Sequence, residues 1–194
     1  SLWLGDGRRA VARFESDETL RADAVDALGS LRALGMTVHM ASGDAAGRVA
    51  GIASRLSIDT ALARQSPEAK LAYVRALQAR GRVVAMVGDG INDAPVLAGA
   101  DVSIAIGSGA ALAQRAGDIV LTGSSLARIA QAASLARRTR TVIRQNLGWA
   151  LAYNVVALPA AVTGIVPPWM AALGMSLSSL AVTLNALRLA RAVP

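Results

Sequence analysis

An apolar run that ends at a glycine–acid–glycine sequence is the feature that most constrains the fold of this chain. Residues 83–87 are Val-Val-Ala-Met-Val, a pattern that predicts a buried strand. Gly88-Asp89-Gly90 follows directly, and the residues before Pro95 are typical of a helix start. A strand that stops in this way places a carboxylate at the carboxyl edge of a sheet, where open α/β folds bind their ligands. The alternative is an ordinary glycine-rich turn followed by a capped helix.

The acids of this segment have the chemistry of a magnesium site. Asp89 and Asp93 offer hard oxygen donors, and Mg²⁺ is usually held by one or two carboxylates together with phosphate and water. The neighbouring glycines leave room for a phosphate and a cation to approach the backbone.

Two earlier loops each precede an expected helix and carry residues that could serve the same site. Ser42-Gly43-Asp44 follows an expected strand at 37–41, where a hydroxyl and backbone amides can hold a phosphoryl oxygen, although capping of the next helix is the commoner use. Ser66-Pro67 predicts a capped helix start, and Lys70 lies one turn into that helix. Lys70 is therefore either an exposed lysine or a cation directed toward the sheet edge.

The remaining elements complete an alternation of strands and helices. We expect helices at 19–34 and 45–56, further strands at 101–106 and 118–121, and a short helix after Gly107. This alternation predicts an α/β fold with a doubly wound parallel sheet. Before it, residues 2–14 predict a hairpin with Asp6 in its turn rather than as a nucleophile. His39, the only histidine, is expected to be a packed or edge residue rather than a ligand.

The last third of the chain predicts a membrane hairpin. A long helix is expected at 125–146, and the stretches 147–166 and 169–187 contain no charged residue. Each stretch is close to the about 20 residues that cross a bilayer, and arginines flank only their outer ends. This pattern places both ends in the cytoplasm, with a buried soluble helical hairpin as the alternative. The mean hydropathy of +0.44 supports a membrane segment, and the net charge of +7 with few aromatic residues favours a membrane-proximal role over nucleic-acid binding.

Residues 86–95, preceded in order by Ser42 and Lys70, resemble the phosphorylation domain of P-type cation-transporting ATPases, which belong to the haloacid-dehalogenase-like superfamily. The resemblance implies a Rossmann-like domain at 15–124, with helices on both faces of a parallel sheet, after the last hairpin of a nucleotide domain at 1–14. It implies a connecting helix at 125–146 and a two-helix transmembrane hairpin at 147–194. It also implies ATP as substrate, Mg²⁺ on the two acids, and contacts to the phosphoryl group from these residues: Ser42, Gly43, Asp44, Lys70, Asp89, Asn92 and Asp93. Ser42 departs from the family's usual threonine but retains the hydroxyl.

Tyr153-Asn154 and the pair Met175 and Ser179, four residues apart, resemble the last two helices of monovalent-copper pumps. A thioether favours Cu⁺ over a hard cation. Zinc and cadmium pumps would be expected to have charged residues in these spans, so the resemblance implies translocation of Cu⁺ (or Ag⁺) out of the cytoplasm. It implies a multi-pass protein of the bacterial inner membrane with a cytoplasmic phosphorylation domain.

The phosphorylated aspartate of Asp-Lys-Thr-Gly-Thr is not in this sequence, nor is the Cys-Pro-Cys motif, because the chain has no cysteine. We therefore expect a C-terminal portion of a pump that is inactive alone. Its expected partners are the lipid bilayer, the N-terminal remainder with the nucleophile, actuator domain and Cys-Pro-Cys helix, and a copper chaperone, but no nucleic acid. The alternatives are a membrane-anchored phosphatase of the same superfamily and a non-catalytic membrane remnant.

Overall fold

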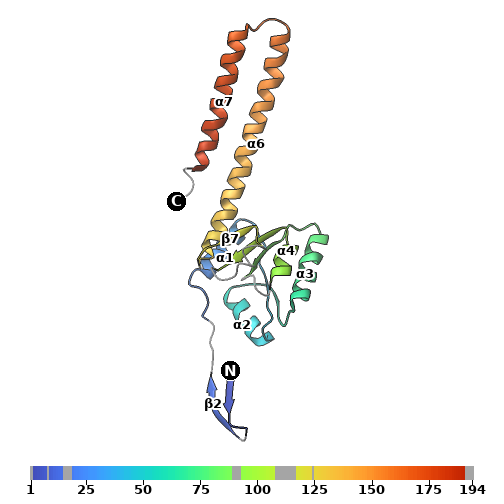
Figure 1. Ribbon diagram of the computed structural model, residues 1–194, viewed down its shortest axis with the longest axis vertical. Coiled ribbons are helices and arrows are strands. Elements are labelled where there is room, and N and C mark those ends of the chain that lie inside the picture. The colour runs from blue at the N-terminus through green and yellow to red at the C-terminus, as the bar shows by residue number, and fades with distance from the viewer. Residues whose placement is uncertain are drawn as a thin grey trace. The chain divides into compact units, whose positions relative to one another are not determined.

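The computed structural model describes residues 2–7, 9–14, 19–88, 93–107, 117–123 and 125–190 (Figure 1). The chain divides into two compact units, Ser1–Ala127 and Arg128–Pro194. Each unit is described by itself below.

The first unit begins with a β-hairpin. Strands β1 (Leu2–Gly5) and β2 (Ala10–Phe14) are antiparallel, with Leu4 opposite Ala12. In the turn, the backbone N–H of Arg9 donates to Asp6 Oδ1 at 3.0 Å, and Gly7 has a φ of +87° that favours glycine. The predicted hairpin is confirmed, and Asp6 is a turn residue.

The remaining strands are all parallel, as predicted, but they form two hydrogen-bonded sets. Strand β3 (His39–Ala41) pairs with β4 (Thr60–Leu62), and β5 (Ala85–Gly88), β6 (Val102–Ile106) and β7 (Ile119–Leu121) pair in that order. Strand β4 was not predicted, because its sequence, Thr-Ala-Leu, contains only one large apolar residue. Among the described residues, β3 and β5 are each an edge strand with one hydrogen-bonded neighbour.

The described connections between strands contain four helices: α1 (Ala24–Ala33), α2 (Ala46–Arg55), α3 (Pro67–Ala79) and α4 (Ala94–Gly99). Helix α1 starts later than predicted, because the N–H of Ala24 donates to the carbonyl of Arg21 in a preceding turn. It stops before Gly35, whose φ of +74° suits a glycine at a helix end. Helix α3 begins as predicted, since the Ser66 hydroxyl accepts from the N–H of Ala69 at 3.2 Å.

The core of this unit is centred on α4. Val96 and Leu97 are completely buried, and α4 packs against α3, β5 and β6. The prediction that residues 83–87 are a buried run is wrong for one face, because Val83, Ala85 and Val87 are exposed, and the strand begins only at Ala85. Residues two apart along a strand point to the same face, so one face of β5 is uncovered among the described residues.

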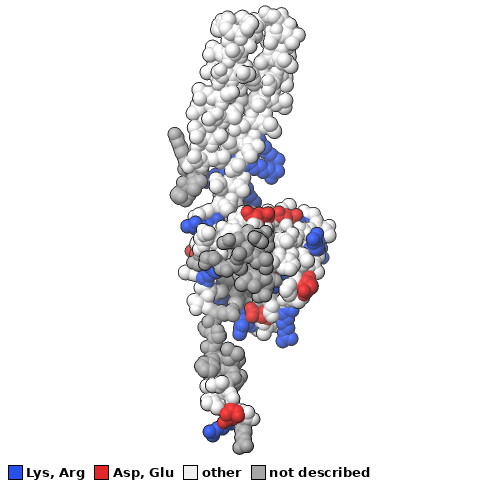
Figure 2. All heavy atoms as spheres, in the orientation of Figure 1, with Lys and Arg blue, Asp and Glu red and all other residues white. Residues whose placement is uncertain are grey.

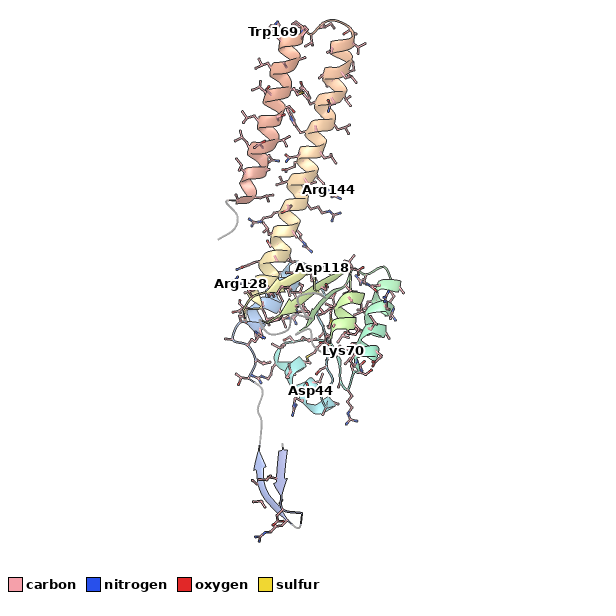
Figure 3. The ribbon with its side chains drawn as sticks, viewed as in Figure 1. Asp44, Lys70, Asp118, Arg128, Arg144 and Trp169 are labelled. Atoms are coloured by element: carbon pink, nitrogen blue, oxygen red, sulfur yellow. The ribbon has the colours of Figure 1, made fainter. Side chains whose placement is uncertain are left out.

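The second unit is an antiparallel helical hairpin. Helix α6 (Ala127–Val162) and α7 (Pro168–Ala190) are joined by a turn in which Gly164 has a φ of +74°. Trp149 Nε1 donates to Ser178 Oγ at 3.0 Å and Asn185 Nδ2 donates to Asn146 Oδ1 at 2.8 Å, which places the two helices side by side. Figure 3 shows Trp169 at the turn end of this hairpin and Arg144 farther along α6, away from the turn.

The expected connecting helix and first span are one continuous helix that ends at Val162, before the predicted end at residue 166. By length and composition, one helix in the described part of the chain is able to cross a membrane, and it is α7. The predicted second span, 169–187, lies inside α7.

Candidate functional site

An ion pair joins two of the predicted site residues. Lys70 Nζ lies 2.8 Å from Asp93 Oδ1, and the two side chains are only 15% and 14% exposed. Lys70 is held at the first turn of α3 by the Ser66 cap, and Asp93 immediately precedes α4, where its carbonyl accepts from the N–H groups of Val96 and Leu97. Because those two residues are fully buried, the backbone that presents Asp93 is anchored in the core.

Gly88 at the end of β5 makes room for this carboxylate. A Cβ at Gly88 would lie 3.1 Å from Asp93 Oδ2 and 3.2 Å from Asp93 Cβ, closer than most real contacts. A larger residue would push Asp93 away from the strand end. The glycine predicted from the motif therefore has a steric role. The space beside it is bordered by the Asp93 carboxylate, a hard oxygen donor of the kind that Mg²⁺ prefers.

The Ser42 loop is rigidly built. Ser42 Oγ donates to Asp44 Oδ2 at 2.7 Å and accepts from the N–H of Asp44 at 3.2 Å. The backbone of Ser42 extends the pairing of β3 with β4, donating to the carbonyl of Leu62 and accepting from Gln65. Arg48 lies 3.4 Å from Asp44 Oδ1. Helix α2 has no side-chain hydrogen bond at its N-cap, so the alternative that these residues cap α2 is wrong.

The structure describes two parts of the predicted site, the Ser42 loop and the Lys70–Asp93 pair. These two described parts are not in direct contact through hydrogen bonds. Within the described residues, no hydrogen bond links Ser42 or Asp44 to Lys70 or Asp93. Asp89 and Asn92 lie outside the described residues, as does the short helix expected after Gly107. Among the residues that the structure describes, no group of three or more His, Cys, Asp or Glu side chains is able to hold a metal ion. Figure 3 labels Asp44 and Lys70.

One sequence signal for Lys70 was not used in the prediction. Lys70 is the only lysine of the sequence, and all the other long cationic side chains are arginines. A lysine is a compact point charge, and an arginine is a planar fork with different hydrogen-bond geometry. A lone lysine half-buried against a carboxylate is thus distinguished from the exposed arginines around it.

Two further carboxylates fasten the strands near the site, and sequence reasoning missed both roles. Asp118 Oδ2 accepts from the N–H and the hydroxyl of Ser103, at 2.9 Å each, and these bonds lower the pKa of Asp118. Asp101 Oδ2 accepts from the N–H of Val84 at 2.8 Å, which, with a side-chain bond from Gln78, lowers the pKa of Asp101. Their only signal is an acid directly before a short apolar strand.

A third carboxylate closes the start of α6. Asp23 Oδ2 accepts from the N–H of Ala127 at 3.0 Å and from the Ser125 hydroxyl at 2.8 Å. The Ala127 bond and then the Ser125 bond lower the pKa of Asp23. This contact was also missed, because its partners are about a hundred residues apart in the sequence.

The four predicted metal-path residues lie on the helical hairpin without forming one site. The Tyr153 hydroxyl approaches Gly174 of α7, since a Cβ there would lie 2.8 Å from it. Asn154 Nδ2 donates to the carbonyl of Ala150 in its own helix at 2.9 Å. Met175 is 65% exposed and Ser179 is also exposed, so neither is covered within the hairpin.

A polar cluster at the other end of the hairpin was not predicted. Asn185 Nδ2 donates to Asn146 Oδ1 at 2.8 Å and to Gln145 Oε1 at 3.2 Å, and its Oδ1 accepts from Arg188 at 3.2 Å. Amides that face one another across two helices form such clusters in apolar surroundings. The cluster fixes the register of α6 on α7 beside the first arginine after the apolar segment.

Comparison with known proteins gives the same fold. The family model described as haloacid dehalogenase-like hydrolase matches residues 3–101. A probable copper-exporting P-type ATPase V of Mycobacterium tuberculosis is 44% identical over 191 residues, which are 98% of this chain and 25% of that protein. A copper-exporting P-type ATPase of Staphylococcus aureus is 44% identical over 172 residues, 89% of this chain and 21% of that protein.

Among solved structures, a zinc-transporting PIB-type ATPase in an E2·Pi state matches with a TM-score of 0.83 at 40% identity. The match covers 89% of this chain and 28% of that structure. The chain therefore spans about a quarter of the length of the proteins it matches.

Proposed function

Because the chain belongs to the haloacid dehalogenase-like hydrolases, we propose that it is the phosphorylation domain and a membrane hairpin of an ATP-driven heavy-metal pump. The observation that best supports this proposal is the half-buried pair of Lys70 with Asp93 beside Gly88 at the end of β5. The 44% identity to copper-exporting ATPases along almost the whole chain supports the same assignment.

In this proposal the site acts by positioning and charge neutralisation, which account for most of the catalysis of phosphoryl transfer. Lys70 and the Ser42-Gly43-Asp44 loop hold phosphoryl oxygens, and Asn92 orients the group. Asp89 and Asp93 hold Mg²⁺, which supplies positive charge against the phosphate when it is bound. The close contact of Lys70 with Asp93 keeps both side chains at the strand end.

The missing nucleophile has a place in the proposed architecture. Ser42 follows β3 and Gly88 ends β5, and each of these strands has one unpaired edge as far as the described residues extend. A parallel strand from the remainder of the pump, paired with both edges, would present its last residue between the hydroxyl loop and the Lys70–Asp93 pair. That residue would be the phosphorylated aspartate, and its arrival would join the two sets into one sheet.

The proposed cargo is Cu⁺ (or Ag⁺), moved out of the cytoplasm past Tyr153, Asn154, Met175 and Ser179. The sequence from 145 to 187 has no charged residue, which favours a soft monovalent cation over a divalent one. The exposure of Met175 and Ser179 leaves them accessible to other helices of the pump. The zinc-transporting structure, at 40% identity, makes Zn²⁺ the second candidate.

Membrane location follows from the same proposal. We place α7 and the apolar part of α6 in the bacterial inner membrane as two spans of a multi-pass protein, with the phosphorylation domain in the cytoplasm. A copper chaperone would deliver the cargo. The membrane-anchored phosphatase is less favoured, because Asp6, its early candidate nucleophile, lies in a hairpin turn.

The test is phosphoenzyme formation from ATP in the complete pump. Lys70→Met should slow aspartyl-phosphate formation by about 10²–10³-fold, the usual cost of removing one electrostatic contact to the reacting group. Arg75→Gln, which removes an exposed charge from the same helix, should have little effect. Asp89→Asn should slow phosphoenzyme turnover and raise the Mg²⁺ concentration that turnover needs. Unchanged turnover in the Lys70 and Asp89 variants, or phosphatase turnover by this chain alone, would refute the assignment.

A further inference from the structure

The second unit has a charge imbalance that it cannot correct internally. No Asp or Glu follows Asp118 in the sequence, whereas seven arginines lie between residues 128 and 191. In Figure 2 the far part of the helical hairpin is white throughout, and the sequence has no charged residue from 145 to 187. An anion that compensates these arginines must come from outside the unit.

Two of these arginines line one hollow. A cavity of about 260 Å³ lies between α6 and α7, lined by Arg138, Thr141, Val142, Gln145, Arg188 and Leu189. Its two guanidinium groups come from different helices, so a ligand in it would contact both. Arg188 is oriented by its bond to Asn185, the residue that ties α7 to Asn146 and Gln145. The α7 side of the cavity is therefore held in place by hydrogen bonds to α6.

The position of the cavity along the helices indicates its ligand. The uncharged part of the hairpin begins after Arg144 and ends before Arg188, so the cavity lies where the apolar segments stop. In a bilayer this level is occupied by lipid headgroups, and arginine pairs with their phosphates in a bidentate manner. Val142 and Leu189 give the wall an apolar part suited to a glycerol backbone or the start of an acyl chain.

We infer that Arg138 and Arg188 form a binding site for the phosphate of an anionic phospholipid at the cytoplasmic end of the hairpin. The volume is below the about 300–1,000 Å³ of sites for drug-sized ligands, which fits a headgroup rather than a whole lipid. This inference rests on the proposed membrane location of α6 and α7. A lipid held across both helices would add to the Asn185 cluster in fixing their register.

The experiment places the 194-residue chain in phosphatidylcholine nanodiscs with a minor fraction of phosphatidylglycerol. Native mass spectrometry then measures which lipid is retained. Phosphatidylglycerol should be retained selectively, and each of Arg138→Gln and Arg188→Gln should weaken its binding about fivefold, the change that corresponds to about 1 kcal/mol per arginine near a membrane surface. Arg137→Gln is the control. It removes the same charge at the neighbouring position, but the Arg137 side chain does not line the cavity, so the substitution should have little effect.

Equal weakening by Arg137→Gln and Arg138→Gln would show diffuse attraction and overturn the site. Displacement of the lipid by an equal concentration of glycerol phosphate would show that the cavity takes free phosphates, and would overturn a lipid site. Flotation of the chain with vesicles separates the two levels of the proposal. A chain that does not float would reject the membrane hairpin and the lipid site together, whereas flotation without selective retention would reject the lipid site alone.

Discussion

Asp118 shows how single carboxylates hold the sheet beside the site. Its Oδ2 accepts from the N–H and the hydroxyl of Ser103, and its own N–H donates to Ser103 Oγ at 2.9 Å. Ser103 is 4% exposed and lies on the central strand β6 of its set. Loss of the carboxylate would leave a buried hydroxyl and N–H with a poorer partner, which is destabilising.

The substitution Asp118→Asn should therefore lower the free energy of unfolding near neutral pH. The hydrogen bonds keep the pKa of folded Asp118 below its ordinary 3.8, so their stabilisation is fully present above about that pH and is lost as the pH falls toward the folded pKa. The difference between the two proteins should shrink over this acid range in denaturant titrations. Asp26→Asn, an exposed position in α1, is the control, and a pH-independent difference at Asp118 would contradict the assignment.

For single residues, the sequence predicted local roles better than it predicted contacts between distant residues. The Ser66 cap, the turn role of Asp6 and the glycine at the end of β5 follow from local chemistry, and the structure confirms the first two. The partner of Lys70 was not predictable from local pattern, because Asp93 is 23 residues away and the contact depends on the packing of α3 on α4. The same holds for Asp23 with Ala127.

Among the elements, α3 depends on its first residue. The Ser66 hydroxyl satisfies the N–H of Ala69, so Ser66→Ala should cost about 1 kcal/mol of stability. The substitution should also loosen the turn that holds Lys70. Ser54→Ala, at an exposed position within α2, should be neutral or slightly stabilising, since alanine has the higher helix propensity. Denaturant midpoints of the two variants test this, and equal midpoints would refute the capping role.

The contact of α6 with α7 depends on a small residue. Because the Tyr153 hydroxyl lies against Gly174, Gly174→Leu should separate the helices and cost about 1–3 kcal/mol by overpacking. Gly148→Leu is the matched control, because nothing lies within 4 Å of a Cβ there. Since the chain has no cysteine, a pair introduced at Trp149 and Ser178 reports the separation through a short thiol cross-linker. Equal cross-linking in both leucine variants would show that Gly174 is not a contact point.

The expected strand at 83–87 illustrates where an element prediction fails. The apolar run predicts burial on both faces, yet Val83 is 82% exposed and Val87 is 37% exposed. A run of apolar residues indicates burial on both faces of a strand, but it does not indicate which element provides the cover. Strand β4 was missed for a different reason, because Leu62 is its only large apolar residue.

For the whole molecule, the two strand sets give a prediction about assembly. If a strand from the rest of the pump pairs with β3 and β5, amide hydrogen exchange in both strands should slow when that part is present. Strand β7 lies at the opposite edge of the β5-β6-β7 set from β5. It should exchange at an unchanged rate and is an internal control. Exchange mass spectrometry of this chain alone and within the complete pump makes the comparison. Unchanged exchange in β3 and β5 would exclude the joined sheet.

The central claim is that this chain belongs to a pump that couples ATP hydrolysis to the movement of a soft monovalent metal. The most direct measurement is vanadate-sensitive ATPase activity of the complete pump with Cu⁺, Ag⁺ and Zn²⁺ supplied in turn. We expect stimulation by Cu⁺ and Ag⁺, little by Zn²⁺, and loss of the Cu⁺ stimulation in Met175→Ala. Stimulation by Zn²⁺ alone would assign the other cargo, and the absence of metal-stimulated hydrolysis with any of the three would contradict the claim.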